Sequence, residues 1–371
     1  MPASTLRADV LVIGGGLVGC SVAYECAKRG LSVVVAERGE AGRAASWAAA
    51  GILTPIHLAD YPPALVALCT AAQASYEGWT AEVRAESGID PEFRRTGMLV
   101  LALEEGDLAE VEKLLAWKRE HGQPCEELDA AAAAKVEPLA NPKMLRALHL
   151  PDIAQVRNNR LVRAVAAAAT RRRATILERT EALDLLTDGG RVVGAHTTQG
   201  NVYAASTVLA AGAWSRAIAE RVGVTVAVEP VRGQMLLTEV PGGRLSKMVL
   251  AGEQYLVPRA DGRVLVGSTT ERAGFDASVT LDGVRALGEA AARMVPSLAS
   301  APLRASWAGL RPGSPDRIPF LGPVTGLPGL LLACGHFRNG ILLGPITGRL
   351  IAQTITGEAT EVPLAPYAPG R

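Results

Sequence analysis

The order of hydrophobic and polar positions near the N-terminus changes from a strand pattern to a helix pattern and back. Val10–Ile13 is a continuous apolar run, which predicts a buried parallel strand. Apolar residues then recur at helical spacing over residues 18–27, and Gly30 is a typical helix stop. Leu31–Ala36 is a second apolar run. The pattern predicts a strand–helix–strand unit.

Later segments show two kinds of pattern. Val208–Ala211 and Leu330–Cys334 are apolar runs that predict further buried strands, and a C-terminal helix is expected soon after Asn339. Between these runs, Asp261-Gly262 separates two apolar-rich segments, as in a β-hairpin. The order predicts an α/β fold with two domains: a discontinuous nucleotide-binding domain (residues 1–88, 150–222 and 303–371) and an inserted antiparallel-sheet substrate domain (residues 89–149 and 223–302).

The composition narrows the class of protein. The chain has 371 residues, 49% hydrophobic and 20% charged, with a formal net charge of +1. It is therefore expected to be globular, and nucleic acid is not an expected partner. Its five cysteines form no C-x-x-C pair, so neither a disulfide framework nor a zinc site is indicated, which fits a reducing cytoplasm. The N-terminal apolar run is too short and too rich in glycine to span a membrane.

The turn after the first predicted strand carries a dinucleotide-binding motif. Gly14, Gly16 and Gly19 fit G-x-G-x-x-G: the first permits a tight turn, the second lets a pyrophosphate approach the backbone, and the third lets the helix pack on the strand. The helix N-terminus offers free N–H groups to the phosphates. Glu37, at the end of the second strand, is placed to accept hydrogen bonds from ribose hydroxyls.

The motif alone does not distinguish NAD from FAD, but its place at the start of the chain and the lack of a second copy favour FAD. The small residues of Ala41–Leu53 would let a flat ring lie against the backbone, although a plain alanine-rich loop is the alternative. Pro55–Pro63 predicts a loop. The strand Val208–Ala211 ends at Gly212, which could approach the dinucleotide from the other side.

A basic segment lies between the last predicted strand and the C-terminal helix. His336, Phe337 and Arg338 fall at the carboxyl end of the strand, where open α/β sheets bind ligands, and the following helix directs its positive N-terminus there. Arg338 is therefore a candidate contact for a carboxylate or for the flavin; the alternative is an ion pair with a structural acid such as Asp316. For His336 a structural role is expected rather than proton transfer.

The residues "VIGGGLVGCSVAYECAKRG", "AAGAWS", "PVRGQML", "YLVPRADGRVLVGSTTERAGFD", "WAGLRPGSPDRIPFLGP" and "GHFRNGILLGPITG" give the chain a wider resemblance. It resembles the glycine oxidase and D-amino-acid oxidase family of FAD-dependent amine oxidases, and the thiamin-biosynthesis glycine oxidases in particular. The resemblance implies a Rossmann-like FAD-binding domain with an antiparallel substrate domain, and homo-oligomers, often tetramers. Because the stretch "LRPGSPDRIP" lacks the cysteine that bonds flavin in sarcosine oxidases, FAD is expected to be noncovalent.

The resemblance also implies site residues. The substrate-carboxylate arginine falls on Arg311, a second substrate-contacting arginine on Arg338, and the active-site tyrosine on Tyr255. FAD contacts fall on Gly14, Gly15, Gly16, Leu17, Val18, Glu37, Arg38, Ala44, Ala45, Ser46, Ala50, Gly51, Ile52, Ala182, His336, Phe337, Arg338, Asn339, Gly340, Ile341 and Leu342.

One position departs from the family pattern. Glu253 stands where one well-known glycine oxidase has histidine, so its charge lies either near the substrate amine or at a solvated strand end. The expected reaction is hydride transfer from the Cα of a small amino acid, glycine first, to flavin N5, with dioxygen as acceptor and the oxo acid, ammonia and hydrogen peroxide as products. Three alternatives stay open: a dehydrogenase that passes electrons to a quinone or carrier, a broader D-amino-acid oxidase, and a noncatalytic nucleotide-binding protein.

Overall fold

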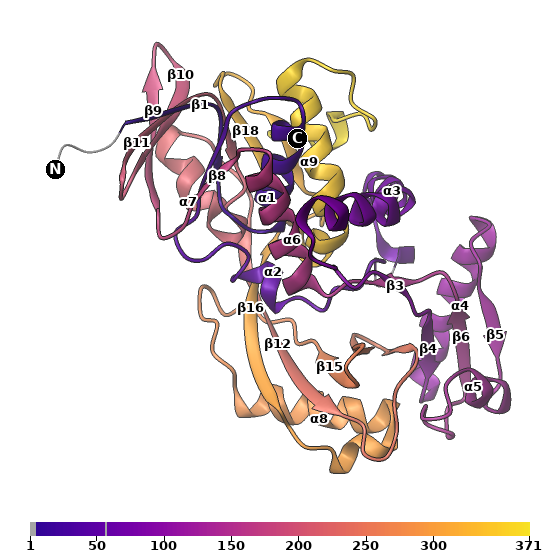
Figure 1. The fold of residues 1–371 in the computed structure, drawn as a ribbon. Coiled ribbons are helices and arrows are strands. Elements are labelled where there is room, and N and C mark those ends of the chain that lie inside the picture. The colour runs from indigo at the N-terminus through magenta and orange to yellow at the C-terminus, as the bar shows by residue number, and fades with distance from the viewer. Residues whose placement is uncertain (1–4, 56–57) are drawn as a thin grey trace.

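Two eight-stranded sheets organise the computed structural model, which describes residues 5–55 and 58–371 (Figure 1). The first sheet has the order β17 (Phe320–Pro323), β18 (Leu330–Cys334), β11 (Gly200–Leu209), β1 (Leu6–Ile13), β2 (Val33–Ala36) and β8 (Thr175–Leu177). All neighbours from β18 to β8 are parallel, whereas β17 is antiparallel to β18. A hairpin of β9 (Ala182–Asp188) and β10 (Arg191–Thr197) extends from β11.

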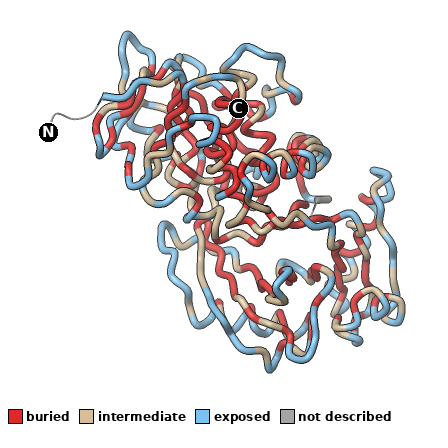
Figure 2. Tube along the Cα trace, in the orientation of Figure 1, coloured by how far each residue is buried: buried red, intermediate tan, exposed pale blue. Residues whose placement is uncertain are grey.

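The two faces of this parallel sheet bury alternate residues of the same strands. Val10 and Val12 of β1 pack with the helices α1 (Leu17–Lys28), α3 (Pro63–Ser87), α6 (Asn158–Arg171) and α9 (Gly340–Thr356). Leu11 and Ile13 pack instead with residues of the β9–β10 hairpin and with the segment after α7 (Ser215–Ala219). Burial on both faces explains why these strands are continuous apolar runs in the sequence. Figure 2 shows the buried residues concentrated in this layer.

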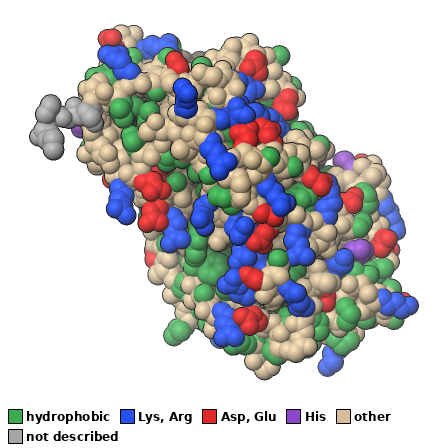
Figure 3. Space-filling view, in the orientation of Figure 1, with side chains coloured by type: hydrophobic (Ala, Val, Ile, Leu, Met, Phe, Trp, Pro, Cys, Tyr) green, Lys and Arg blue, Asp and Glu red, His purple; other side chains and the backbone are tan. Residues whose placement is uncertain are grey.

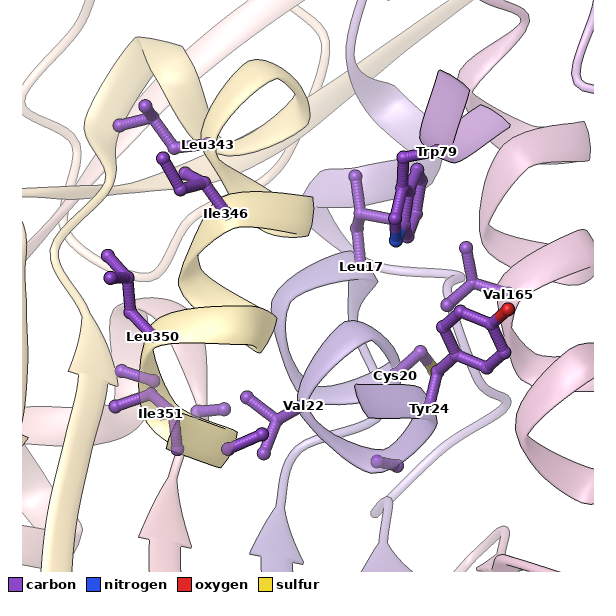
Figure 4. Close-up of a cluster of buried hydrophobic side chains, with 14 of the residues drawn as sticks. Leu17, Cys20, Val22, Tyr24, Trp79, Val165, Leu343, Ile346, Leu350 and Ile351 are labelled. Carbon is purple, nitrogen blue, oxygen red and sulfur yellow. The ribbon is translucent and has the colours of Figure 1, made fainter. Parts of the chain in front are cut away.

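Helices α1 and α9, from opposite ends of the chain, pack side by side on the first sheet (Figure 4). Leu17 and Val22 of α1 and Leu343 and Leu350 of α9 belong to one buried cluster. The approach is close because Gly348 of α9 lies against the backbone of α1: a Cβ there would stand 2.6 Å from the carbonyl oxygen of Ser21. Glycine is therefore required at this crossing.

The second sheet has the order β16 (Ala305–Gly313), β12 (Glu229–Glu239), β15 (Arg263–Gly267), β14 (Gln254–Pro258), β13 (Met248–Ala251), β4 (Met98–Ala102), β6 (Arg146–Leu150) and β5 (Glu126–Leu128). All of its neighbours are antiparallel except β4 and β13. One face packs on α8 (Leu281–Met294) and α5 (Ala130–Val136), and the other on α4 (Glu105–Glu120). Strands β12 and β16 reach up toward the first sheet (Figure 1).

Short elements complete the chain. A two-stranded sheet pairs β3 (Arg94–Arg95) with β7 (Ala154–Gln155), and the short helix α2 (Ala45–Ala48) lies beside β16. Single 3-10 turns occupy η1 (Leu58–Asp60), η2 (Gly212–Trp214), η3 (Glu220–Val222), η4 (Pro296–Ser300), η5 (Phe337–Asn339) and η6 (Ala365–Tyr367). The loop expected over Pro55–Pro63 includes residues 56 and 57, which lie outside the described residues.

The α/β class, the strand–helix–strand start and the hairpin at Asp261-Gly262 are confirmed. One strand lies on the other side of an expected boundary. Residues from 303 onward were assigned to the nucleotide-binding part, yet β16 pairs along its whole length with β12 of the second sheet. The pairing is long-range: the partner residues in β12 lie 68 to 84 positions earlier in the chain, and no local sequence pattern indicates it. The division into two domains otherwise stays a prediction.

Charges of both signs are interspersed on the face of the molecule seen in Figure 3. No helix within the described residues has the length and apolar character to cross a membrane. Over residues 5–55 and 58–371, no group of three or more His, Cys, Asp or Glu side chains is arranged to hold a metal ion.

Candidate active site

A single cavity connects the carboxyl ends of the parallel strands with the second sheet. Ile13 and Ala36 line it at the ends of β1 and β2, and Cys334 lines it at the end of β18. The opposite wall comes from the second sheet and includes Tyr255 of β14 and Arg311 of β16. The cavity therefore lies where ligands of open α/β sheets bind, and it extends to side chains of another sheet.

The dinucleotide motif has the geometry that its spacing predicts. Gly14 has a φ of 110°, and a Cβ on it would lie 2.4 Å from the carbonyl oxygen of Ala210. A Cβ on Gly19 would lie 1.9 Å from the carbonyl oxygen of Gly14, so the helix packs directly on the turn. Helix α1 begins at Leu17, and its N-terminus faces the cavity. Backbone N–H groups and the positive end of the helix are thus available to phosphate oxygens.

Glu37 lies at the same end of the cavity, and its carboxylate is held by the backbone. One oxygen accepts the N–H of Gly15 at 2.7 Å and the other accepts the N–H of Gly39 at 2.8 Å. Each carboxylate oxygen has a further lone pair, so both can also accept hydrogen bonds from the two hydroxyls of a ribose. The neighbouring Arg38 stacks on the ring of Trp214 with 3.6 Å between Cζ and the ring centroid.

The small-residue segment forms one side of the cavity and is held by buried polar side chains. Asn158 donates from Nδ2 to the carbonyl oxygens of Ser46 and Trp47, at 2.7 and 2.8 Å. Arg259, at the end of β14, is buried and donates to the carbonyl oxygen of Ala50 at 2.8 Å and to Asn158 Oδ1 at 3.2 Å. It also donates to Gln155 Oε1 and to the Val156 carbonyl. One side chain of the second sheet thus fixes the segment that would lie along the cofactor.

Arg311 presents its guanidinium to the cavity at the other end. Nη2 donates to Ser268 Oγ at 2.7 Å and Nη1 donates to the carbonyl oxygen of Thr269 at 3.1 Å, both neutral acceptors. Neither of these described hydrogen-bond acceptors is an Asp or Glu oxygen. Burial lowers the pKa of Arg311, which marks a cation that has lost part of its hydration without a direct ion pair. Such a group can bind an incoming carboxylate through two parallel hydrogen bonds.

The space for the Arg311 guanidinium exists because residue 233 of the neighbouring strand is glycine. A Cβ on Gly233 would lie 2.1 Å from Nη1 of Arg311. Tyr255 completes this end: its ring is buried, and its hydroxyl contacts Met235 Sδ at 3.6 Å. Tyr255 also lies close enough to Arg311 to oppose the lowering of the arginine pKa.

Arg338 lies in the turn η5 and lines the same cavity as Arg311. The positive charge of Arg338 contributes to the lowered pKa of Arg311, so the two arginines lie within electrostatic range of each other. The proposed ion pair of Arg338 with Asp316 is not formed, since Asp316 binds Arg371. Arg338 instead donates from Nη2 to Glu253 Oε2 at 2.5 Å and to Thr270 Oγ1 at 2.7 Å.

His336 borders the cavity and is buried. Its Nε2 lies 3.0 Å from Thr347 Oγ1 on α9, and burial lowers the pKa of the imidazole to about 3. The ring is therefore neutral at physiological pH. This environment supports the structural interpretation of His336 over proton transfer.

Most residues expected to contact the cofactor line this cavity, including Gly212 and Ala182. Gly15, Gly19 and Leu342 do not: Gly15 binds Glu37, Gly19 packs on Gly14, and Leu342 is 1% exposed in the core. Glu253 lies outside it, beside Arg338. Sequence reasoning missed further lining residues from the second sheet and its neighbours, namely Gly233, Met235, Ser268, Gly309 and Trp214. No local pattern identifies Gly233, Met235, Ser268 and Gly309, because the pairing of β12 with β15 and β16 brings them together at the wall. Trp214 lies instead in η2, after β11 of the first sheet.

The residues present fit FAD. Gly14 and Gly16 border the cavity without side chains, the α1 N-terminus faces the same space, and Glu37 is placed for a ribose. The small residues Ala44–Ile52 and the backbone of residues 336–341 border the rest of the cavity up to Arg311. A dinucleotide bound at Glu37 would therefore extend its other end to the two arginines.

Comparisons with known proteins agree with this geometry. The family model of FAD dependent oxidoreductases (DAO) matches residues 9–354. The glycine oxidase of Pseudomonas aeruginosa is 40% identical over 97% of this chain and 98% of its own length. The hydrogen cyanide synthase subunit HcnC of the same species is 32% identical over 98% and 96%. The crystal structure of glycine oxidase from Geobacillus kaustophilus superposes with a TM-score of 0.94, at 34% identity and 99% coverage of both chains. The chain therefore belongs to the DAO family of FAD-dependent oxidoreductases.

Proposed function

We propose that the protein is a glycine oxidase that acts on glycine and other small amino acids. The single observation that carries the substrate class is Arg311, a partly desolvated cation with neutral hydrogen-bond partners, which faces a cavity that fits FAD. The glycine oxidases that are 34–40% identical to the chain support the choice of glycine. The overall reaction converts glycine, dioxygen and water into glyoxylate, ammonia and hydrogen peroxide.

The side chains have separate tasks in this proposal. Arg311 binds the substrate carboxylate in a bidentate pair, which sets the direction of the Cα–H bond as a point charge would not. Tyr255 supplies a hydroxyl beside that pair, and the buried Met235 and Tyr255 keep water away from the reacting carbon. When bound, FAD supplies the acceptor for the two electrons of that C–H bond.

The proposal is tested by Arg311→Ala, with steady-state glycine oxidation followed by peroxide release. Truncating one partner of a buried, hydrogen-bonded charge pair costs about 3–5 kcal/mol, so kcat/KM for glycine should fall by roughly two to four orders of magnitude, with FAD still bound. Arg311→Lys keeps the charge but not the two-pronged geometry and should recover little. The control is Arg304→Ala, which removes an exposed arginine paired with Glu239 just before β16. Unchanged glycine turnover in Arg311→Ala would contradict the proposal.

Dioxygen as acceptor is part of the same proposal, and a dehydrogenase that uses a quinone or carrier is its alternative. Stoichiometric peroxide during glycine turnover under air supports the oxidase. Reduction of an artificial quinone with no peroxide would favour the dehydrogenase. A cytoplasmic location, a homotetramer, noncovalent FAD and a place in thiamin biosynthesis stay predictions from the sequence.

A further inference from the structure

A second recess adjoins the active-site cavity and shares Phe337 and Arg338 with it. Its wall is strongly charged: three acids, Asp60, Glu110 and Glu253, stand against two arginines, Arg317 and Arg338. Arg338 therefore stands at the boundary between the space beside Arg311 and this recess. Any substrate that extends beyond the Arg311 contact toward Arg338 meets the charges of the recess.

Glu253 forms an ion pair with Arg338 at this boundary. The 2.5 Å contact joins an arginine whose side chain is 19% exposed to a carboxylate that is 53% exposed. Thr270 accepts a second hydrogen bond from the same nitrogen, Nη2. The Nε of Arg338 is buried and has no hydrogen-bond partner among the described residues. Arg338 is thus neutralised by Glu253 yet keeps a donor unused.

We propose that Glu253 is a specificity-determining residue that excludes ligands carrying a second anionic group. The inference rests on the proposed function, because it takes Arg311 as the anchor of the first carboxylate. A second carboxylate that reached Arg338 would have to approach Glu253, and like charges placed together in a site are unfavourable. Discrimination by an opposing charge is a common way to reject one ligand without improving contacts to another.

The charges near Arg311 are consistent with a ligand that extends from Arg311 to Arg338. Arg338 lowers and Glu253 raises the pKa of Arg311, so both charges act on the anchor itself. Without Glu253, the recess would hold Asp60 and Glu110 against two arginines, and Asp60 is paired with Lys113. Arg338 would then be available as a second carboxylate anchor.

The test compares two ligands of nearly the same shape that lack the oxidisable amine: ethoxyacetate, with one carboxylate, and diglycolate, with two. Isothermal titration calorimetry of the FAD-loaded protein gives the ratio of their dissociation constants. Glu253→Gln should shift that ratio in favour of diglycolate by about tenfold. Glu253→Asp, which restores the charge, should return the ratio toward the natural value. The matched control is Thr270→Val, which removes a hydrogen bond to the same Nη2 without changing charge and should leave the ratio within twofold.

The inference is overturned if Glu253→Gln changes the affinity for both ligands by one common factor, or if Thr270→Val shifts the ratio as much. Either result would mean that Glu253 only holds Arg338 in place. Glycine turnover of the unmodified protein is measured on the same preparation. Because the two ligands need no oxidation, failure of glycine turnover and failure of the charge discrimination are separate results.

Discussion

Gly233 allows a prediction that separates substrate binding from cofactor binding. In Gly233→Ala the new Cβ would stand 2.1 Å from Nη1 of Arg311, whereas ordinary contacts begin at 3.4 Å. The guanidinium must therefore move by more than 1 Å and leave its hydrogen bonds to Ser268 and Thr269. A misplacement of about 1 Å at a reacting site costs on the order of 10²-fold in rate, or about 2.7 kcal/mol. We expect kcat/KM for glycine to fall by that factor.

The assay pairs steady-state glycine oxidation with FAD titration of the apoprotein. The matched comparison is Gly309→Ala, because Gly309 is the residue opposite Gly233 in the β12–β16 ladder. A Cβ at position 309 would meet Ala48 Cβ at 2.5 Å, on the segment along the cofactor, so this variant should weaken FAD binding instead. If Gly233→Ala kept kcat/KM within threefold, or lost FAD and not glycine affinity, the assignment of Arg311 as the anchor would be refuted.

Three further outcomes are expected. Replacing Arg259 by Met strands four buried acceptors, at about 1–3 kcal/mol each, so FAD affinity measured by titration should drop at least tenfold, with little recovery in Arg259→Lys. Folding holds the pKa of His336 near 3, below the value of about 6.5 in the unfolded chain. The free energy of unfolding should therefore decrease as the pH falls below about 6.5, by at most about 1.4 kcal/mol per pH unit. Urea unfolding at pH 7 and pH 5 should show a smaller decrease for His336→Gln than for the unmodified protein. Gly348→Ala should destabilise the α1–α9 crossing by about 1–3 kcal/mol, seen as a lower Tm, and an unchanged Tm would contradict the close approach.

The sequence predicted those parts of the fold that local pattern determines. The glycine spacing at Gly14 and the acid at Glu37 are separated by one strand–helix–strand unit, so their meeting follows from short-range geometry. Strand Leu330–Cys334 was predicted with its observed bounds, and the cavity lies at its carboxyl end as expected. The prediction that Arg311 and Arg338 share one site rested on the family resemblance, because twenty-six residues and two strands separate them in the chain.

The rest depends on contacts that no local pattern encodes. The local sequence around Arg259 indicates only the end of a hairpin strand. Its four hydrogen-bond acceptors lie in segments more than a hundred residues earlier. The sequence is compatible with two positions for Glu253, near the substrate amine or at a solvated strand end. In the structure Glu253 lies in the turn before β14 and binds Arg338, eighty-five residues away. Such pairs form where the two sheets meet, so only the assembled fold identifies them.

The packing of α1 against α9 has a consequence for the synthesis of the protein on the ribosome. The glycine turn is translated about three hundred residues before the helix beside it and before the cavity backbone at residues 336–341. A nascent chain therefore carries a dinucleotide motif without a complete binding site until α9 has been translated. We expect FAD loading to follow translation of α9, and a chain shortened before α9 to bind FAD poorly.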